Sequence, residues 1–170
     1  HDSADRHLRC TKRSEGRRHA SRPVSVRAQQ MTRIFVDTGG WIAVATRRDQ
    51  YHAAASDFAA ELARRKRPLL TTNYVLVEAY THIRYHDGHH KVVAFDDAIH
   101  ELIEANRLSI SWIDPSVHSE ALAILRRYSD QAFSLVDCSS FVIARRKRVR
   151  EVFGFDGNFR TFGFILKPLG

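Results

Sequence analysis

The sequence predicts an α/β fold in which a mainly parallel sheet is covered by helices on both faces. Short apolar stretches typical of strands alternate with longer stretches of helical periodicity from Met31 onward. Parallel strands need long crossover connections, and the helical stretches supply them. The composition agrees, because 44% of the 170 residues are hydrophobic and 27% are charged, which is typical of a globular domain with a buried core.

The expected strands are short and apolar. The first, Ile34-Phe35-Val36, is an uninterrupted apolar run, whereas residues 108–113 alternate between apolar and polar side chains as a half-buried strand does. The strands are expected over residues 34–36, 69–72, 108–113 and 152–155.

The expected helices are delimited by turn and capping residues. The first begins at Trp41, after a turn at Gly39-Gly40. Cations suit the C-terminus of the second helix, and Pro68 stops it. Gly88 separates two later helices, and Pro115 opens another. The helices are expected over residues 41–46, 51–66, 74–81, 92–103, 115–125 and 135–148.

The first thirty residues differ from the rest of the chain. They contain eight Lys or Arg, three acids and no aromatic residue, and they carry a net +5 of the chain's formal +8. So little apolar surface cannot offset the entropy that is lost on ordering. We therefore expect residues 1–30 to be a disordered basic leader outside the native domain, with an organelle transit peptide as the alternative, and residues 31–170 to form the folded domain.

The composition also excludes several classes of protein. No apolar run reaches the roughly 18 residues that a membrane span requires. The two cysteines, Cys10 and Cys138, cannot build a disulfide framework or a cysteine zinc site. We expect a soluble, cytoplasmic protein. Because residues 31–170 carry only +3, charge alone is weak evidence for nucleic-acid binding, and the case rests on particular residues.

Two acidic residues directly follow expected strands. Asp37 comes after Ile34-Phe35-Val36, and Asp156 comes after the strand at 152–155. Open α/β folds place their sites at the carboxyl ends of strands, so these side chains can meet although they are far apart in sequence. Taken alone, Asp37 is also an ordinary turn or helix N-cap residue.

Two more acids lie within apolar stretches. Glu78 interrupts the expected helix at 74–81, where an unpaired carboxylate would be costly if it were buried. Asp137 lies at the expected start of the last helix. The alternatives are a partly exposed Glu78 near His82 or Arg84 and an N-cap role for Asp137.

Together, the four acids indicate a metal site. Two carboxylates about 4 Å apart repel by about 4 kcal/mol at an effective dielectric constant of about 20, so a cluster persists only with raised pKa values or bound cations. Mg²⁺ is a hard cation that accepts a few carboxylates together with water and phosphate oxygens. We expect Asp37, Glu78, Asp137 and Asp156 to hold Mg²⁺ against an RNA phosphate for in-line hydrolysis.

This pattern of acids resembles that of the PIN-domain ribonucleases, and most closely that of the VapC-like toxins of toxin–antitoxin pairs. The resemblance covers residues 32–168. Its motifs are residues 35–41, 73–80, 134–141 and 153–159. It implies a three-layer α/β/α fold, Mg²⁺- or Mn²⁺-dependent RNA cleavage by the four acids, and a hydroxyl near the site at Ser134. It also implies dimerisation and inhibition by an antitoxin that enters the active-site groove.

Two further features have ordinary explanations beside functional ones. The run Arg145-Arg146-Lys147-Arg148 either grips the RNA backbone or is a solvated helix end whose cations match the helix dipole. His82 and His86 are spaced like a zinc pair but have no evident third ligand.

Other functions remain open at this point. An aspartyl phosphatase also has Asp-Thr after its first strand, but it places a second Asp two positions after the first, where this chain has Gly39. The alternatives to a toxin are a non-toxin RNA-processing nuclease of the same family and a catalytically inactive domain that binds RNA or protein.

Overall fold

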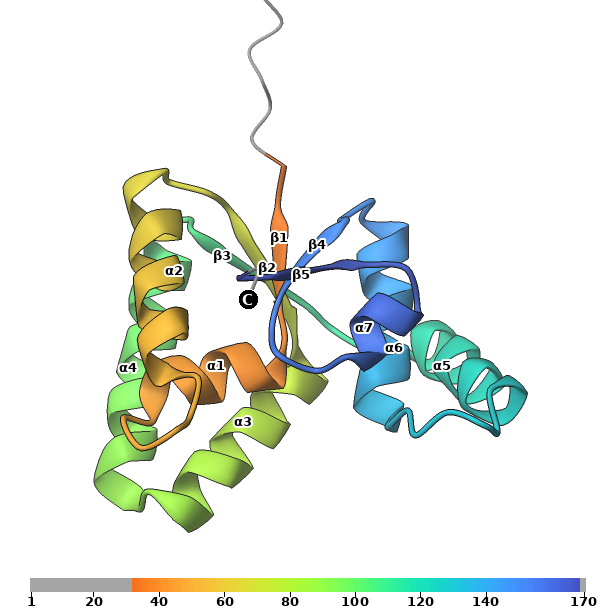
Figure 1. Cartoon of the computed structure of the whole chain (residues 1–170), viewed down its shortest axis with the longest axis horizontal. Helices are drawn as coiled ribbons and strands as arrows, with labels where there is room; N and C mark the ends of the chain where they lie inside the picture. Colours follow the sequence, from red (N-terminus) through yellow and green to blue (C-terminus); the bar gives the residue numbers. More distant parts are fainter. Residues whose placement is uncertain (1–31, 169–170) are drawn as a thin grey trace, which may run out of the picture. The chain divides into compact units, whose positions relative to one another are not determined.

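Residues 32–168 are described by a computed structural model, and they are built around a five-stranded sheet (Figure 1). Every strand pairing within these residues is parallel. The strands are β1 (Ile34–Val36), β2 (Leu69–Thr72), β3 (Leu108–Ser111), β4 (Glu151–Phe153) and β5 (Ile165–Lys167). The expected leader, residues 1–30, lies outside the described residues.

The strand order, β3-β2-β1-β4-β5, reverses direction beside β1. The chain moves outward from β1 to β2 and β3, and then returns to the other side of β1 to form β4 and β5. Such a reversal leaves a crevice outside the carboxyl ends of the two strands that flank it, which is where open parallel sheets bind ligands. In this chain the two strands are β1 and β4.

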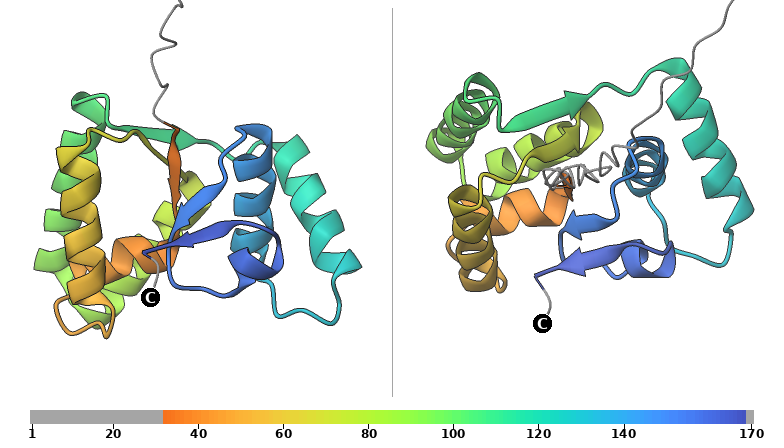
Figure 2. Two further views of the ribbon diagram at one scale, coloured as in Figure 1. Left: turned by 45° about the horizontal axis from the view of Figure 1, so that its top comes forward. Right: turned by 90° about the horizontal axis from the view of Figure 1, so that it is seen from above.

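Helices cover both faces of the sheet, which confirms the predicted fold class. In the two views of Figure 2, α2 and α4 lie on one side of the sheet, and α5 and α6 lie on the other. The helices are α1 (Thr38–Ala45), α2 (His52–Arg64), α3 (Asn73–His86), α4 (His89–Glu104), α5 (Pro115–Arg127), α6 (Leu135–Arg146) and α7 (Asn158–Thr161).

The expected turn at Gly39-Gly40 is wrong, because both glycines lie inside α1. A Cβ atom at Gly40 would come within 2.5 Å of the Phe153 carbonyl oxygen. Glycine therefore allows the first turn of α1 to lie against the end of β4. Close backbone approach, rather than a turn, explains this residue.

Other boundaries also differ from the expectation. The strand expected at 152–155 ends at Phe153, and the helix expected at 135–148 ends at Arg146. Neither α7 nor β5 was predicted from the sequence: the four residues of α7 are too few to display a helical period, and the short β5 ends in the charged Lys167.

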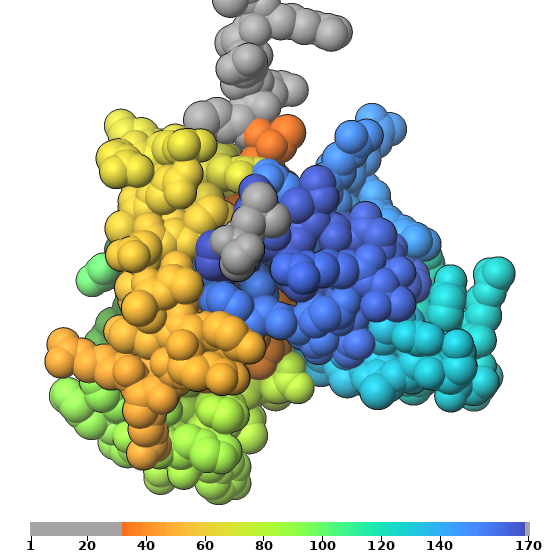
Figure 3. Space-filling model, viewed as in Figure 1, coloured from red at the N-terminus to blue at the C-terminus, as the bar shows by residue number. Residues whose placement is uncertain are grey.

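The core joins the sheet to its helices through β1 and a group of phenylalanines. All three residues of β1 are fully buried. On the α6 side, the ring of Phe141 packs edge-to-face on Phe159 at 5.0 Å and stacks on Phe162 at 4.2 Å. On the α2 side, Phe58 packs on Phe153 at 5.0 Å. In Figure 3 the gold atoms of α2 lie beside blue atoms of the C-terminal part of the domain. The ring of Phe159 also lies 6.3 Å from that of Phe35 in β1, so helices on both sides of the sheet contact the central strands.

Three helices end in the same backbone conformation at the end of the sheet where the strands begin, here called the amino edge. Lys66, Asn106 and Arg148, just past the ends of α2, α4 and α6, have φ values of 50°, 54° and 56°. After each, the next backbone N–H donates to a carbonyl five residues back, as Val149 does to Ala144 at 2.8 Å. This is the Schellman ending, in which glycine is the usual residue at the left-handed position.

No helix within residues 32–168 has the length and apolar character needed to cross a membrane.

Candidate active site

Asp37 lies at the carboxyl end of β1 and caps the N-terminus of α1. Its Oδ2 accepts a hydrogen bond from Gly39 N at 3.4 Å, whereas its Oδ1 is buried and has no hydrogen-bond partner among the described residues. The side chain is only 4% exposed. Burial, reinforced by the nearby carboxylates of Asp137 and Glu78, raises the pKa of Asp37 from 3.8 to about 7 despite backbone hydrogen bonds that lower it. The N-cap alternative is also correct, but it leaves one oxygen unsatisfied.

The end of β4 is built closely around Asp37. A Cβ atom at Gly154 would lie 3.0 Å from the Cβ of Asp37, and Asp37 N donates to Phe153 O at 2.9 Å. The backbone that follows β4 therefore packs directly against Asp37.

Glu78 lies in the first half of α3 and is exposed. The partly exposed alternative is thus correct, and the idea that Glu78 is a buried charge is wrong. Its partner is neither His82 nor Arg84, since Thr38 Oγ1 donates to Glu78 Oε2 at 2.5 Å. Thr38 directly follows Asp37, and this hydrogen bond brings Glu78 to the edge of the sheet that holds Asp37.

Asp137 lies in the first turn of α6, where Ser134 is the N-cap. Asp137 N donates to Ser134 Oγ at 3.0 Å, and Ser134 N donates to Asp137 Oδ2 at 2.8 Å, which together form a capping box. Burial raises the pKa of Asp137, the hydrogen bonds from Ser134 lower it, and the Asp156 carboxylate raises it. The hydroxyl of Ser134 is therefore occupied in fixing the position of this acid.

Asp156 is exposed in the turn between β4 and α7. It is connected to Asp137 by Asn158, whose Nδ2 lies 3.2 Å from Asp156 Oδ2 and 3.4 Å from Asp137 Oδ2. Asn158 N also donates to Asp156 Oδ1 at 2.8 Å. Sequence reasoning missed both Asn158 and Thr38, although each stands beside a predicted acid within a quoted motif.

The four predicted acids therefore lie along one edge of the sheet and affect each other electrostatically. The carboxylates of Asp137 and Glu78 raise the pKa of Asp37, and the carboxylate of Asp156 raises the pKa of Asp137. Within residues 32–168, however, no three His, Cys, Asp or Glu side chains are gathered closely enough to hold a metal ion as they stand. Instead, the acids accept hydrogen bonds from neutral groups: Glu78 from Thr38, Asp137 from Ser134 and Asn158, and Asp156 from Asn158.

The basic run that begins at Arg145 lies at the other end of α6, away from these acids. Arg146 pairs with Glu120 at 2.6 Å, and Arg145 stacks over the ring of Phe162 at 4.1 Å. Because α6 runs antiparallel to the strands, Asp137 is at their carboxyl edge and Arg148 is at the amino edge. The fold does not bring the predicted RNA-binding residues to the acids.

His82 and His86 stack at 4.1 Å on α3, and the His86 ring is bonded to the His82 carbonyl oxygen. No third ligand joins them within the described part of the chain.

The fold and its acidic edge are those of a known family. The family model of the PIN domain matches residues 34–165, and this chain belongs to that family. The 23S rRNA-specific endonuclease VapC20 of Mycobacterium tuberculosis is 31% identical over 137 residues, which are 78% of this chain and 95% of that protein; the match recurs in two strains.

Solved structures agree with this assignment. The crystal structure of M. tuberculosis VapC20, described as a sarcin-ricin loop cleaving toxin, matches with a TM-score of 0.66 and 29% identity over 78% of this chain and 96% of that one. VapBC2 from Rickettsia felis, bound to a promoter DNA fragment, matches with a TM-score of 0.57 over 79% of this chain and 97% of that one. At 13% identity, this second likeness shows the fold alone.

Proposed function

We propose that this protein is a metal-dependent endoribonuclease that hydrolyses RNA phosphodiester bonds and acts as the toxin of a toxin–antitoxin pair. The observation that carries the proposal is the acidic edge, where Asp37 is buried near Asp137 and Glu78 with one oxygen that has no partner among the described residues, and where Asp156 lies near Asp137. Membership of the PIN family and the likeness to an rRNA endonuclease support the same reaction.

The residues at this edge fit a divalent cation. Asp37 Oδ1 is a buried acceptor without a donor in residues 32–168, and its neighbours offer carboxylate oxygens, which Mg²⁺ and Mn²⁺ prefer. Asp37, Glu78, Asp137 and Asp156 would hold the ion. When bound, such a cation lowers the pKa of a coordinated water and neutralises the charge of a phosphate.

The other residues of the edge position these acids. Ser134 fixes Asp137 through the capping box, Thr38 holds Glu78, and Asn158 places an amide between Asp137 and Asp156. Each donor satisfies a carboxylate oxygen that would otherwise repel its neighbours. These groups keep the acids near each other without neutralising them.

The names of the relatives support a proposal for the substrate and the antitoxin. The similar VapC20 is named for its action on 23S rRNA, so we propose a structured RNA as the substrate of this chain. We also propose a cognate antitoxin, a homodimer, a cytoplasmic location and a functional domain that spans residues 31–170. A non-toxin RNA-processing nuclease and an inactive RNA- or protein-binding domain remain the alternatives.

The test is cleavage of total RNA by the full chain with Mg²⁺ or with EDTA. We expect Mg²⁺-dependent cleavage that falls by about 100-fold or more in Asp37→Asn. Asp57→Asn, which removes the same charge from an exposed position on α2, is the matched control and should cleave normally. Cleavage that persists in EDTA, or in Asp37→Asn, would refute the proposal. Sequencing of the fragments would identify the cut, and growth arrest relieved by a co-expressed antitoxin would separate a toxin from a processing enzyme.

A further inference from the structure

A basic pocket lies at the amino edge of the sheet, at the opposite end of the strands from the acids. Its volume is about 300 Å³. Its lining residues come from the starts of β1, β2, β4 and β5: Thr32, Arg33, Arg67, Arg148, Arg150, Glu151 and Ile165. Four arginines and a single glutamate give this lining a net charge of +3.

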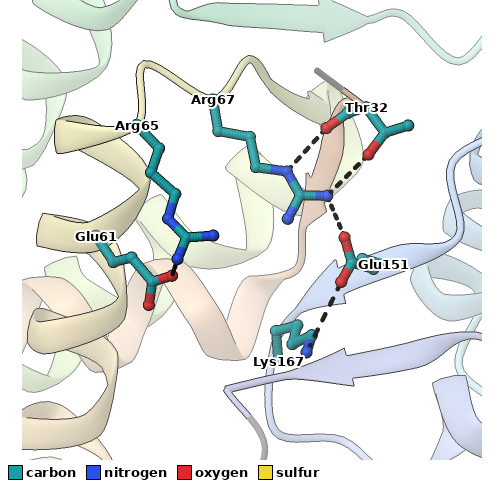
Figure 4. A network of polar contacts seen from close by, with 6 residues as sticks. All are labelled: Thr32, Glu61, Arg65, Arg67, Glu151 and Lys167. Atoms are coloured by element: carbon teal, nitrogen blue, oxygen red, sulfur yellow. Dashed lines mark hydrogen bonds and ion pairs between the residues drawn. The ribbon is translucent and has the colours of Figure 1, made fainter. Parts of the chain in front are cut away.

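The one acid of the pocket is already neutralised. Glu151 pairs with Arg67, and the Lys167 ammonium lies 3.8 Å from its other oxygen (Figure 4). Arg67 is further fixed by a hydrogen bond from its Nε to Thr32 O at 2.8 Å. By contrast, Arg33, Arg148 and Arg150 are exposed and form no ion pair within residues 32–168. Three guanidinium groups, one before β1 and two between α6 and β4, are therefore left for an external anion.

The backbone places the Arg148 side chain just past the end of α6. With φ at 56°, this residue occupies the left-handed position of the Schellman ending of α6, where glycine would be the unstrained choice. Lys66 and Asn106 take the same conformation at the ends of α2 and α4, and a cation suits a helix C-terminus, so what distinguishes Arg148 is that its exposed side chain lines the pocket.

The pocket is remote from the reaction. Its Arg148 follows the C-terminus of α6, whereas Asp137 lies in the first turn of that helix. Twelve residues of helix span about 18 Å at about 1.5 Å per residue. An anion held here is thus not the phosphate that is cut.

We propose that the amino-edge pocket is a second phosphate-binding surface, which holds the backbone of the RNA substrate away from the cleavage edge. One guanidinium group can bind two oxygens of a phosphate at once. Because an RNA strand carries a phosphate at every nucleotide, separate arginines can bind successive phosphates. An acidic peptide fits less well, because Ile165 is the only large apolar side chain in the lining. The choice of RNA rests on the proposed function.

The test measures binding without cleavage. The full chain binds a fluorescent single-stranded RNA in EDTA, and the affinity is followed as the salt concentration increases. Each phosphate contact contributes about 0.7 to the slope of log affinity against log salt for a single strand. The double variant Arg148→Gly/Arg150→Gln should lower that slope by about 1.4. Arg84→Gln/Arg126→Gln, which removes two exposed charges outside the pocket, is the matched control and should keep the native slope.

The outcomes separate this proposal from the proposed function. Equal slopes in the two double variants would overturn the proposal that this pocket binds phosphate, whatever the nuclease assay shows. A reduced slope in a protein that cleaves no RNA would support the pocket and refute the nuclease. If polyglutamate binding depends on Arg148 and Arg150 and RNA binding does not, the pocket binds an acidic protein, and the proposal fails. Arg148→Gly alone should have a melting temperature no lower than that of the native protein, so a loss of binding would not be due to misfolding.

Discussion

At the scale of single residues, Asp37 combines features that a purely structural residue would avoid. Its carboxyl group is buried near other acids, and one of its oxygens has no partner within the part of the chain that the structure describes. Placing an ionised group there costs free energy, and only a cation or a proton removes that cost. This is the compromise between stability and activity that is expected of a catalytic site.

The raised pKa of Asp37 predicts a pH-dependent stability. Folding raises this pKa from 3.8 to about 7, so the folded state retains the proton more tightly than the unfolded state. The stabilising contribution is complete below the unfolded pKa and is lost as the pH rises toward 7, up to about 4 kcal/mol at about 1.4 kcal/mol per pKa unit. In EDTA at pH 8, Asp37→Asn should therefore unfold at a higher urea concentration than the native chain, and the difference should shrink at pH 4. A variant less stable than native at pH 8 would contradict this reading.

Asn158 gives a second prediction at this scale. Asn158→Ala removes the amide that separates Asp137 from Asp156, and it should lower cleavage by about 10- to 100-fold, as the loss of groups that orient metal ligands does. The measurement is the Mg²⁺ dependence of the cleavage rate. A variant with native Mg²⁺ dependence would show that the amide has no positioning role.

At the scale of elements, the site depends on how closely α1 approaches β4. Gly40 permits that approach, because a Cβ atom would lie 2.5 Å from the Phe153 carbonyl oxygen. Asp37 caps α1, and β4 leads to Asp156. The contact between Gly40 and Phe153 therefore affects both the packing of α1 on β4 and the position of the acids.

Gly40→Ala should consequently damage both stability and activity. The added methyl group meets backbone that cannot rotate away, so we expect a loss of about 1–3 kcal/mol in the free energy of unfolding. Gly157→Ala is the control, since a Cβ atom there meets nothing within 4 Å and φ is −59°. Denaturant unfolding of both variants checks the prediction, and equal losses would contradict it.

The sequence predicted most elements but not their packing. Periodicity revealed the alternation of strands and helices, and the position after an apolar strand pointed to Asp37. The contact that makes Gly40 necessary joins residues more than a hundred positions apart, so the pair Gly39-Gly40 was interpreted as a turn. Thr38 and Asn158 were missed because their partners, Glu78 and Asp137, come close only in the folded chain.

At the scale of the whole described domain, parallel strands separate the charges. Every strand in residues 32–168 points the same way, so the residues that follow strands gather at one edge and those that precede strands gather at the other. Acids occupy the carboxyl edge, and the arginines of the basic pocket occupy the amino edge. The formal charge could not predict this division, since it depends on the strand order. The division suggests that cleavage and part of RNA binding are built on opposite edges.

Binding of Mn²⁺ to the full chain, measured by titration calorimetry in the absence of RNA, tests the central claim most directly. The account predicts saturable binding to the native chain and to Asp57→Asn, and its loss in Asp37→Asn and Asp137→Asn. Equal binding of Mn²⁺ by the native chain and both of these last variants would show that the acidic edge does not hold the metal.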